Sequence, residues 1–198
     1  MNSFSFRSDL EIWCAFKAGD DQAFEYIYHL HSLELFSYGC HIVKDRQLVE
    51  DCLHDLFVYL FQHRTTLGDT NAIKYYLFKS LRRRIIEALE KQRKTFIQND
   101  ELVRDDVEAF SYPQEVKMIE EESNAHRSKY LIAAVNTLPK RQQEAIYLLY
   151  FNDLNYPEIA EIMSLNVRTV YNQVHTGVQT LRKQLKRSEL FPLPQFLE

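Results

Sequence analysis

Residues 155–175 (NYPEIAEIMSLNVRTVYNQVH) contain the pattern that most restricts how this chain can fold. Their apolar residues have helical spacing, and the small Ala160 would let a second helix cross the first one closely. Residues 164–166 then predict a tight turn, in which Asn166 can cap the second helix. The apolar positions of that second helix are Val167, Val170, Val174 and Val178. This layout is typical of a DNA-binding helix-turn-helix, but it also suits an ordinary helical hairpin in an all-α core.

The low content of turn-forming residues predicts that helices dominate the remainder of the chain. Only 4 glycines and 5 prolines occur among 198 residues, and hydrophobic residues make up 45% of the total. Helical periodicity starts after potential N-caps at Ser8, at Asp20 or Asp21, and at Asp45, returns near residue 72, and fades after Lys94. We therefore expect an all-α protein. Its parts would be a helical domain at 8–94, an acidic linker at 95–123, a second helical domain with the helix-turn-helix at 124–187, and a tail at 188–198.

The same periodicity predicts which faces of the N-terminal helices are buried. In the second helix, the expected buried residues are Phe24, Ile27, Tyr28, Leu35 and Tyr38. In the fourth helix, they are Ile73, Leu77, Leu81, Ile85 and Leu89. The segment before this helix, residues 64–71 (RTTLGDTN), is polar and has no periodicity. It therefore predicts an exposed loop.

The charges of the chain are unevenly distributed. The formal net charge of −4 is unusual for a nucleic-acid-binding protein, but the distribution of charge matters more than its total. Residues 79–94 and residues 166–187 each carry a net charge of +5, whereas residues 95–128 carry −6. Two basic segments on either side of an acidic one favour two separate contacts with nucleic acid.

The sequence also predicts a class of protein and a compartment. No apolar run is long enough to cross a bilayer, and the N-terminus lacks the layout of a signal peptide, so we expect a cytoplasmic protein without direct membrane insertion. The odd number of cysteines, Cys14, Cys40 and Cys52, favours buried reduced thiols. The histidines and cysteines lack the spacing of a zinc site. We expect no metal, no cofactor and, without a phosphate-binding loop or a nucleophile–base pair, no enzyme.

Both halves of the chain resemble bacterial sigma factors of the sigma-70 family, extracytoplasmic-function (ECF) subgroup. In the second half, the resemblance rests on Glu158-Ile159-Ala160, Thr169-Val170 and Leu181-Arg182, which match the DNA-binding region 4. In the first half, residues 50–57 (EDCLHDLF) are similar to the core of region 2, and residues 73–94 to its promoter-melting helix. The departures from the family pattern are Tyr76 for tryptophan, Arg83 for asparagine, Glu87 for aspartate and His54 for glutamine.

The resemblance implies a transcription initiation factor that binds RNA polymerase core, directs it to specific promoters and helps to open the DNA. The residues implied in binding the clamp helices of the largest polymerase subunit are Asp51, His54, Asp55, Phe57 and Phe61. Those implied at the minus-ten element are Asp69, Asn71, Tyr75, Tyr76, Lys79, Arg82, Arg83 and Arg84. Those implied at the minus-thirty-five element are Arg168, Thr169, Tyr171, Asn172, His175, Thr176 and Lys183. The resemblance also implies a membrane-anchored anti-sigma factor as a partner.

Within the minus-ten set, different chemical roles are implied. Tyr75 and Tyr76 would form a stacking wedge at the duplex fork, although Tyr76 can instead pack inside the domain. Asp69 and Asn71 would contact the edge of a flipped base. The acidic linker is either a passive tether or a segment that folds back onto a basic patch before polymerase arrives.

Two other functions fit part of these patterns. One is a one-component regulator, in which an N-terminal helical domain senses a ligand and only the helix-turn-helix binds DNA. The other is a protein–protein adaptor that uses its helical faces and never contacts DNA. Transcription with purified core polymerase separates all three, since only a sigma factor supports specific initiation.

Overall fold

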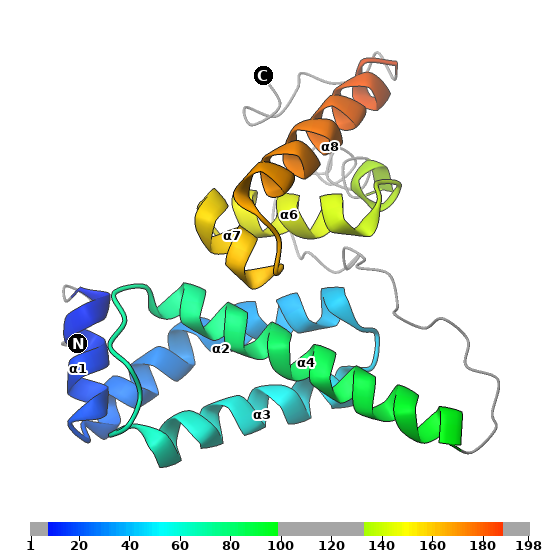
Figure 1. The fold of residues 1–198 in the computed structure, drawn as a ribbon. Coiled ribbons are helices and arrows are strands. Elements are labelled where there is room, and N and C mark those ends of the chain that lie inside the picture. Colours follow the sequence, from blue (N-terminus) through cyan, green and yellow to red (C-terminus); the bar gives the residue numbers. More distant parts are fainter. Residues whose placement is uncertain (1–7, 99–132, 188–198) are drawn as a thin grey trace, which may run out of the picture. The chain divides into compact units, whose positions relative to one another are not determined.

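The computed structural model describes residues 8–98 and 133–187, which form two compact helical units (Figure 1). The first unit contains α1 (Asp9–Lys17), α2 (Asp21–Ile42), α3 (Arg46–His63) and α4 (Ile73–Gln98). The second contains α6 (Lys140–Tyr150), α7 (Tyr156–Ile162) and α8 (Val167–Arg187). No strand occurs within these described ranges, so the predicted all-α fold is confirmed. No helix in the described part of the chain is both long and apolar enough to cross a membrane.

The predicted acidic linker lies largely outside the described residues. α4 continues to Gln98, four residues past the predicted domain boundary at residue 94, and residues 99–132 are not described. Whether this acidic segment is a tether or folds back onto a basic patch therefore stays a prediction. The predicted tail at 188–198 also lies outside the described residues.

Local caps start the first three helices where the sequence predicts them. Ser8 and Glu11 form a reciprocal capping box at α1, and Asp20 accepts hydrogen bonds from the first backbone amides of α2. Asp45 accepts a 3.1 Å hydrogen bond from Leu48 N at the start of α3. These side chains satisfy amide donors that have no partner inside the helix. Each helix therefore starts at a residue that the local sequence selects.

The core of the first unit lies among α2, α3 and α4, with α1 packed across one end (Figure 1). The predicted seam of α4 is buried from Ile73 to Ile85, whereas Leu89 is half-buried. Tyr28, which the periodicity places in the core, is 43% exposed. The largest fully buried side chains are those of Trp13, Tyr38, Phe16, Phe78, Ile27, Leu35, Leu56, Leu60, Ile73, Leu77, Leu81 and Ile85.

The cysteine prediction is wrong for one residue. Cys14 is exposed, whereas Cys40 is half-buried and Cys52 is buried. α1 buries Ile12, Trp13 and Phe16, and Cys14 lies away from this face of the helix. Burial raises the pKa of the Cys40 and Cys52 thiols, which favours their protonated form at neutral pH.

Gly39 allows α2 to approach α3 and α4 closely, and its replacement by alanine should destabilise the first unit. A Cβ atom at Gly39 would lie 2.5 Å from Val49 Cγ1 and 3.2 Å from Ile85 Cδ1. Overpacking of this kind costs about 1–3 kcal/mol, and alanine regains about 1 kcal/mol as a better helix former. We expect thermal or urea unfolding to show a net loss of up to about 2 kcal/mol. Gly68→Ala is the control. No atom lies within 4 Å of the Cβ position at Gly68, so the stability of this variant should match that of the wild type.

His41 should make the first unit less stable in mild acid. This side chain is 2% exposed, and burial lowers its pKa from 6.5 to about 4. Between these two pH values the unfolded chain binds more protons than the folded one, so stability is lost as the pH falls. His41 should therefore lower the free energy of unfolding by about 2 kcal/mol from pH 7 to pH 5.

Urea unfolding at both pH values tests this contribution. The loss of stability from pH 7 to pH 5 should be smaller by that amount in His41→Gln. Part of the loss should remain, because burial also lowers the pKa of His31. The same substitution at the exposed His29 should leave the loss unchanged. An equal loss in wild type and His41→Gln would contradict the assignment.

The second unit contains the predicted helix-turn-helix. Asn155 and Glu158 form a capping box at the start of α7, and Ser164 in the turn has a φ of 54°. Asn166 Oδ1 accepts a 2.7 Å hydrogen bond from Thr169 N, so Asn166 caps α8 as predicted. Gly177 lies where α8 packs closely against α6, and a Cβ atom there would lie 2.8 Å from Ile146 Cδ1.

The buried face of α8 differs in part from the predicted one. Val170 and Val174 are buried, but Val167 is 47% exposed and Val178 is half-buried. Val167 is the first residue of the helix, where the apolar stripe is left open to solvent. The buried positions of α8 are Val170, Val174, Gly177, Leu181 and Leu185.

Candidate functional site

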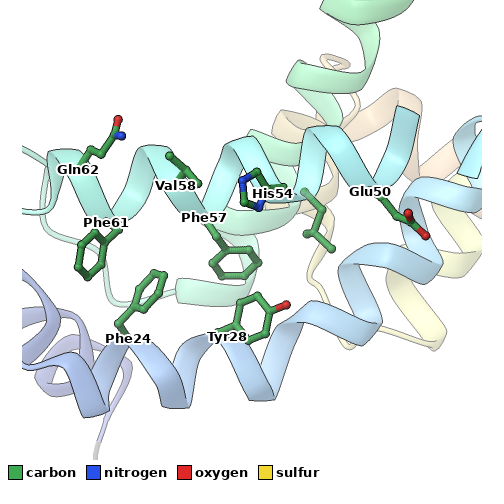
Figure 2. A pocket seen from close by; sticks show the side chains of 9 residues that line it. Phe24, Tyr28, Glu50, His54, Phe57, Val58, Phe61 and Gln62 are labelled. Carbon is green, nitrogen blue, oxygen red and sulfur yellow. The ribbon is translucent and has the colours of Figure 1, made fainter. Parts of the chain in front are cut away.

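A groove rich in aromatic side chains lies between α2 and α3 (Figure 2). Phe24 and Tyr28 from α2 face Phe61 and Phe57 from α3, with ring centroids 5.3 Å apart in the first pair and 4.8 Å in the second. Tyr28 and Phe61 are 43% and 44% exposed. The cavity volume is about 590 Å³, and its lining residues are Phe24, Tyr28, Glu50, Leu53, His54, Phe57, Val58, Phe61 and Gln62. It is an apolar surface open to solvent, which is typical of a protein-binding site.

The predicted polymerase-binding residues lie in or next to this groove. His54, Phe57 and Phe61 line it, although Phe57 is only 5% exposed and is mainly part of the core. Asp51 and Asp55 are exposed on α3 but are not among the lining residues. Asp51 and Asp55 therefore lie on the same helix as the lining residues but outside the groove, whereas the exposed Glu50 lines it. Tyr28 and Phe24 were not predicted for this site, because the α2 periodicity assigns both to the core.

The basic residues of α4 are not equally available to a ligand. Arg83 is exposed, but its Nε donates a 2.7 Å hydrogen bond to Glu87 Oε1, and this bond lowers the pKa of the Glu87 carboxyl. Arg82 and Arg84 are half-buried, and the Arg84 guanidinium lies 5.1 Å from the centre of the Tyr59 ring. Some of the basic side chains of α4 are therefore already in contact with neighbouring side chains.

The two tyrosines predicted to form a wedge differ in their surroundings. Tyr75 is half-buried, and its hydroxyl accepts a 2.9 Å hydrogen bond from Lys79 Nζ. Tyr76 is also half-buried, its ring centroid lies 5.1 Å from that of Trp13, and burial raises its pKa. Tyr76 thus packs partly inside the unit, as the alternative interpretation allowed.

The α3–α4 loop, residues 64–72, contains the two predicted base contacts. Asn71 is exposed, and its side chain has no hydrogen-bond partner among the described residues. Asp69 is also exposed, but its carboxylate forms an ion pair with Lys17 of α1. The contacts from α1 to this loop join residues far apart in the sequence, and sequence reasoning missed them.

Most of the residues predicted to contact the minus-thirty-five element face solvent on α8, the second helix of the helix-turn-helix. Arg168, Asn172 and Thr176 are exposed, and so is Lys183 further along α8. Thr169 is half-buried, and both its amide and its hydroxyl donate to Asn166 Oδ1. Because these donors serve the helix cap, Thr169 is poorly placed to contact a base.

An aromatic row extends across the outer surface of the helix-turn-helix. The Tyr171 ring, which is 55% exposed, is stacked on that of His175 with centroids 6.1 Å apart and an angle of 8° between the planes. On its other side, Tyr171 lies 5.7 Å from the ring of Tyr156 in α7. Sequence reasoning included Tyr171 and His175 but missed Tyr156, which starts a different helix.

Two family models match the chain in order. The model of Sigma-70 region 2 matches residues 27–95, and that of Sigma-70 region 4 matches residues 128–181. The chain is 25% identical to ECF RNA polymerase sigma factor SigM of Bacillus subtilis (strain 168) over 165 residues, covering 81% of this chain and 94% of SigM. It is 26% identical to RNA polymerase sigma factor SigV of the same organism, covering 81% of this chain and 89% of SigV.

Two solved structures share the fold. One is the sigma factor RpoE in complex with the anti-sigma factor NepR from Bartonella quintana, with a TM-score of 0.60, 18% identity, and coverage of 82% of this chain and 96% of RpoE. The other is CnrH in complex with the cytosolic domain of CnrY, with a TM-score of 0.58, 14% identity, and coverage of 91% and 99%.

Proposed function

The chain belongs to the sigma-70 family and is an ECF sigma factor, and from this premise we propose how its two units divide the work of initiation. It is a transcription initiation factor, not an enzyme, which binds RNA polymerase core in the cytoplasm, directs it to specific promoters and helps to open the DNA. The first unit binds polymerase through the α2–α3 groove and the minus-ten element through α4 and the α3–α4 loop. The second unit binds the minus-thirty-five element through α8.

The observation that carries this proposal is the groove inside the region matched to sigma region 2. Partly exposed aromatic rings, in a groove that the exposed carboxylate of Glu50 also lines, suit a partner whose helices present apolar and basic side chains. Asp51 and Asp55 would pair with basic residues of the clamp helices, while Phe61 and Tyr28 would be buried against them. The groove is thus proposed as the polymerase-binding surface.

The DNA-binding roles are supported by positive charge on α4 and by the exposure of side chains on α8. Lys79 and Arg82–Arg84 lie on the basic helix α4, where they would bind phosphates in a strongly salt-dependent manner. On α8, the amide of Asn172 and the guanidinium of Arg168 can form paired hydrogen bonds with adenine and guanine edges. Because one chain links both sites, two weak contacts combine into tight promoter binding.

Run-off transcription tests the function directly. Purified core polymerase should initiate at specific sites on genomic promoter fragments only when this protein is added. Duplex binding without initiation would instead support the one-component regulator. The region 2 match already favours the sigma function over that alternative, because it covers the unit in which a sensor domain would have to lie.

The solved structures that share the fold suggest a further partner, an anti-sigma factor. RpoE is in complex with the anti-sigma factor NepR, and CnrH is in complex with the cytosolic domain of CnrY. We propose that a membrane-anchored anti-sigma factor binds this chain and prevents it from binding core polymerase. Affinity purification of the tagged chain from detergent-solubilised membranes, followed by competition with core polymerase, tests this partner.

A further inference from the structure

We propose that α1 acts as a clamp on the α3–α4 loop, and that Asp69 within this loop is a positioning residue held by Lys17, not a contact to a base. The inference rests on the proposed function, in which the loop receives an unpaired base of the minus-ten element. It changes the role of Asp69, which the sequence predicts as a base contact. It also gives α1, which lies before the matched region 2, a part in promoter opening.

Trp13 is the central residue of this clamp. Its side chain is completely buried, and its Nε1 donates a 2.9 Å hydrogen bond to the carbonyl oxygen of Gly68 in the middle of the loop. Since the indole has a single donor, this bond uses its whole hydrogen-bonding capacity. The same ring packs against Phe16 on α1 and Tyr76 on α4, with centroids 5.3 Å and 5.1 Å away. One side chain thus fixes the loop relative to two helices.

Three ionic or charge-assisted contacts hold the loop along its length. At its start, Arg64 Nη1 lies 3.1 Å from Asp21 Oδ1 in the first turn of α2. Next to Gly68, the Asp69 carboxylate pairs with Lys17 of α1. At its end, Ile73 N donates a 2.7 Å hydrogen bond to Asp9 Oδ2, so a residue of α1 caps α4. The loop in Figure 1 accordingly runs beside α1.

Asp69 and Asn71 have different roles in a loop that α1 holds in place. One oxygen of the Asp69 carboxylate pairs with Lys17, whereas the exposed amide of Asn71 has no partner among the described residues. Pulling a base out of the stack is costly, and a site that must also order itself would bind the base less tightly. A loop fixed in advance by α1 avoids that second cost. Asp69 therefore contributes shape, and Asn71 supplies the group that contacts the base.

Two measurements on the full-length protein and its holoenzyme test the clamp. The first is the emission of Trp13, which is the only tryptophan in the chain, so that the whole signal comes from the residue that binds Gly68. Lys17→Met and Asp69→Asn should each shift its emission to the red, because a released loop admits water to the indole. Cys14→Ser, at an exposed position next to Trp13, should leave the emission unchanged. Unaltered emission in both loop variants would overturn the clamp.

The second measurement is holoenzyme binding to single-stranded minus-ten oligonucleotides with each base varied in turn. Trp13→Phe, which keeps an aromatic ring but loses the donor and part of the indole volume, should weaken binding at least about two- to tenfold, as expected for one lost hydrogen bond, without changing the preferred base. Lys17→Met and Asp69→Asn should weaken binding to the same extent, and the double variant should be no weaker than either. Additive losses would show that Asp69 acts independently of Lys17, and a new base preference in Asp69→Asn would show that Asp69 contacts the base; either result would overturn its positioning role.

The two experiments distinguish this inference from the function on which it rests. A wild-type holoenzyme that neither initiates transcription nor binds the oligonucleotides would contradict the proposed function. The emission of the free protein would still decide whether α1 clamps the loop. A red shift in Lys17→Met and Asp69→Asn would then support the clamp in a protein with a different activity.

Discussion

Replacing Phe61 with glutamate is expected to weaken binding to RNA polymerase core about 100-fold and to abolish initiation at ordinary protein concentrations. The Phe61 ring is 44% exposed at the groove, 5.3 Å from Phe24 and 4.9 Å from the guanidinium carbon of Arg64. Aromatic residues at the centre of an interface contribute about 2–4 kcal/mol. A carboxylate there also leaves an unpaired charge against the partner's apolar side chains, on a helix that already carries Asp51 and Asp55.

A matched variant separates this effect from a general effect of charge. Leu33→Glu changes an apolar residue of α2 that is 77% exposed and does not line the groove, so binding to core should be nearly unchanged. Titration of labelled core polymerase gives both affinities, and circular dichroism checks that the variants remain helical. Equal weakening by the two variants would contradict the groove as the polymerase-binding surface, and so would full binding by folded Phe61→Glu.

The helices were predictable because most of their start signals are local. Ser8, Asp20, Asp45 and Asn166 each cap the helix that immediately follows, so a short window of sequence contains the whole interaction. The start of α4 was not predictable in this way. Its cap is Asp9, 64 residues earlier in the chain, and nothing near Ile73 indicates it.

The candidate site was predictable in its composition but not in its shape. Helical periodicity places Arg168 and Asn172 on the outer face of α8, and both are exposed. Periodicity also assigns Tyr28 to the core, yet it is 43% exposed, because α2 and α3 leave an open groove where their aromatic residues face one another. The relative position of two helices depends on side chains from both, such as Gly39 against Val49, which no single helix pattern contains.

Alanine at Arg168 or Asn172 is expected to remove most of the preference for one base pair of the minus-thirty-five element. Both side chains are exposed on α8, and a paired hydrogen bond to a base edge contributes about 1–3 kcal/mol of discrimination. Each variant should therefore bind its best site about 10- to 100-fold more weakly and bind sites altered at that base pair almost as before. Holoenzyme binding to a promoter series with single substitutions measures both quantities.

Lys183→Ala is the control that distinguishes the loss of a base contact from the loss of a phosphate contact. Lys183 is exposed further along α8, where a lysine is expected to bind phosphate, which positions the unit without selecting bases. Its loss should weaken binding equally on every promoter and reduce the salt dependence by about one phosphate contact. If Arg168→Ala instead weakens all sites alike, Arg168 binds the backbone. Asn172 would then select bases together with Tyr171 and His175 of the aromatic row, whose exposed rings can contact thymine methyl groups in the major groove.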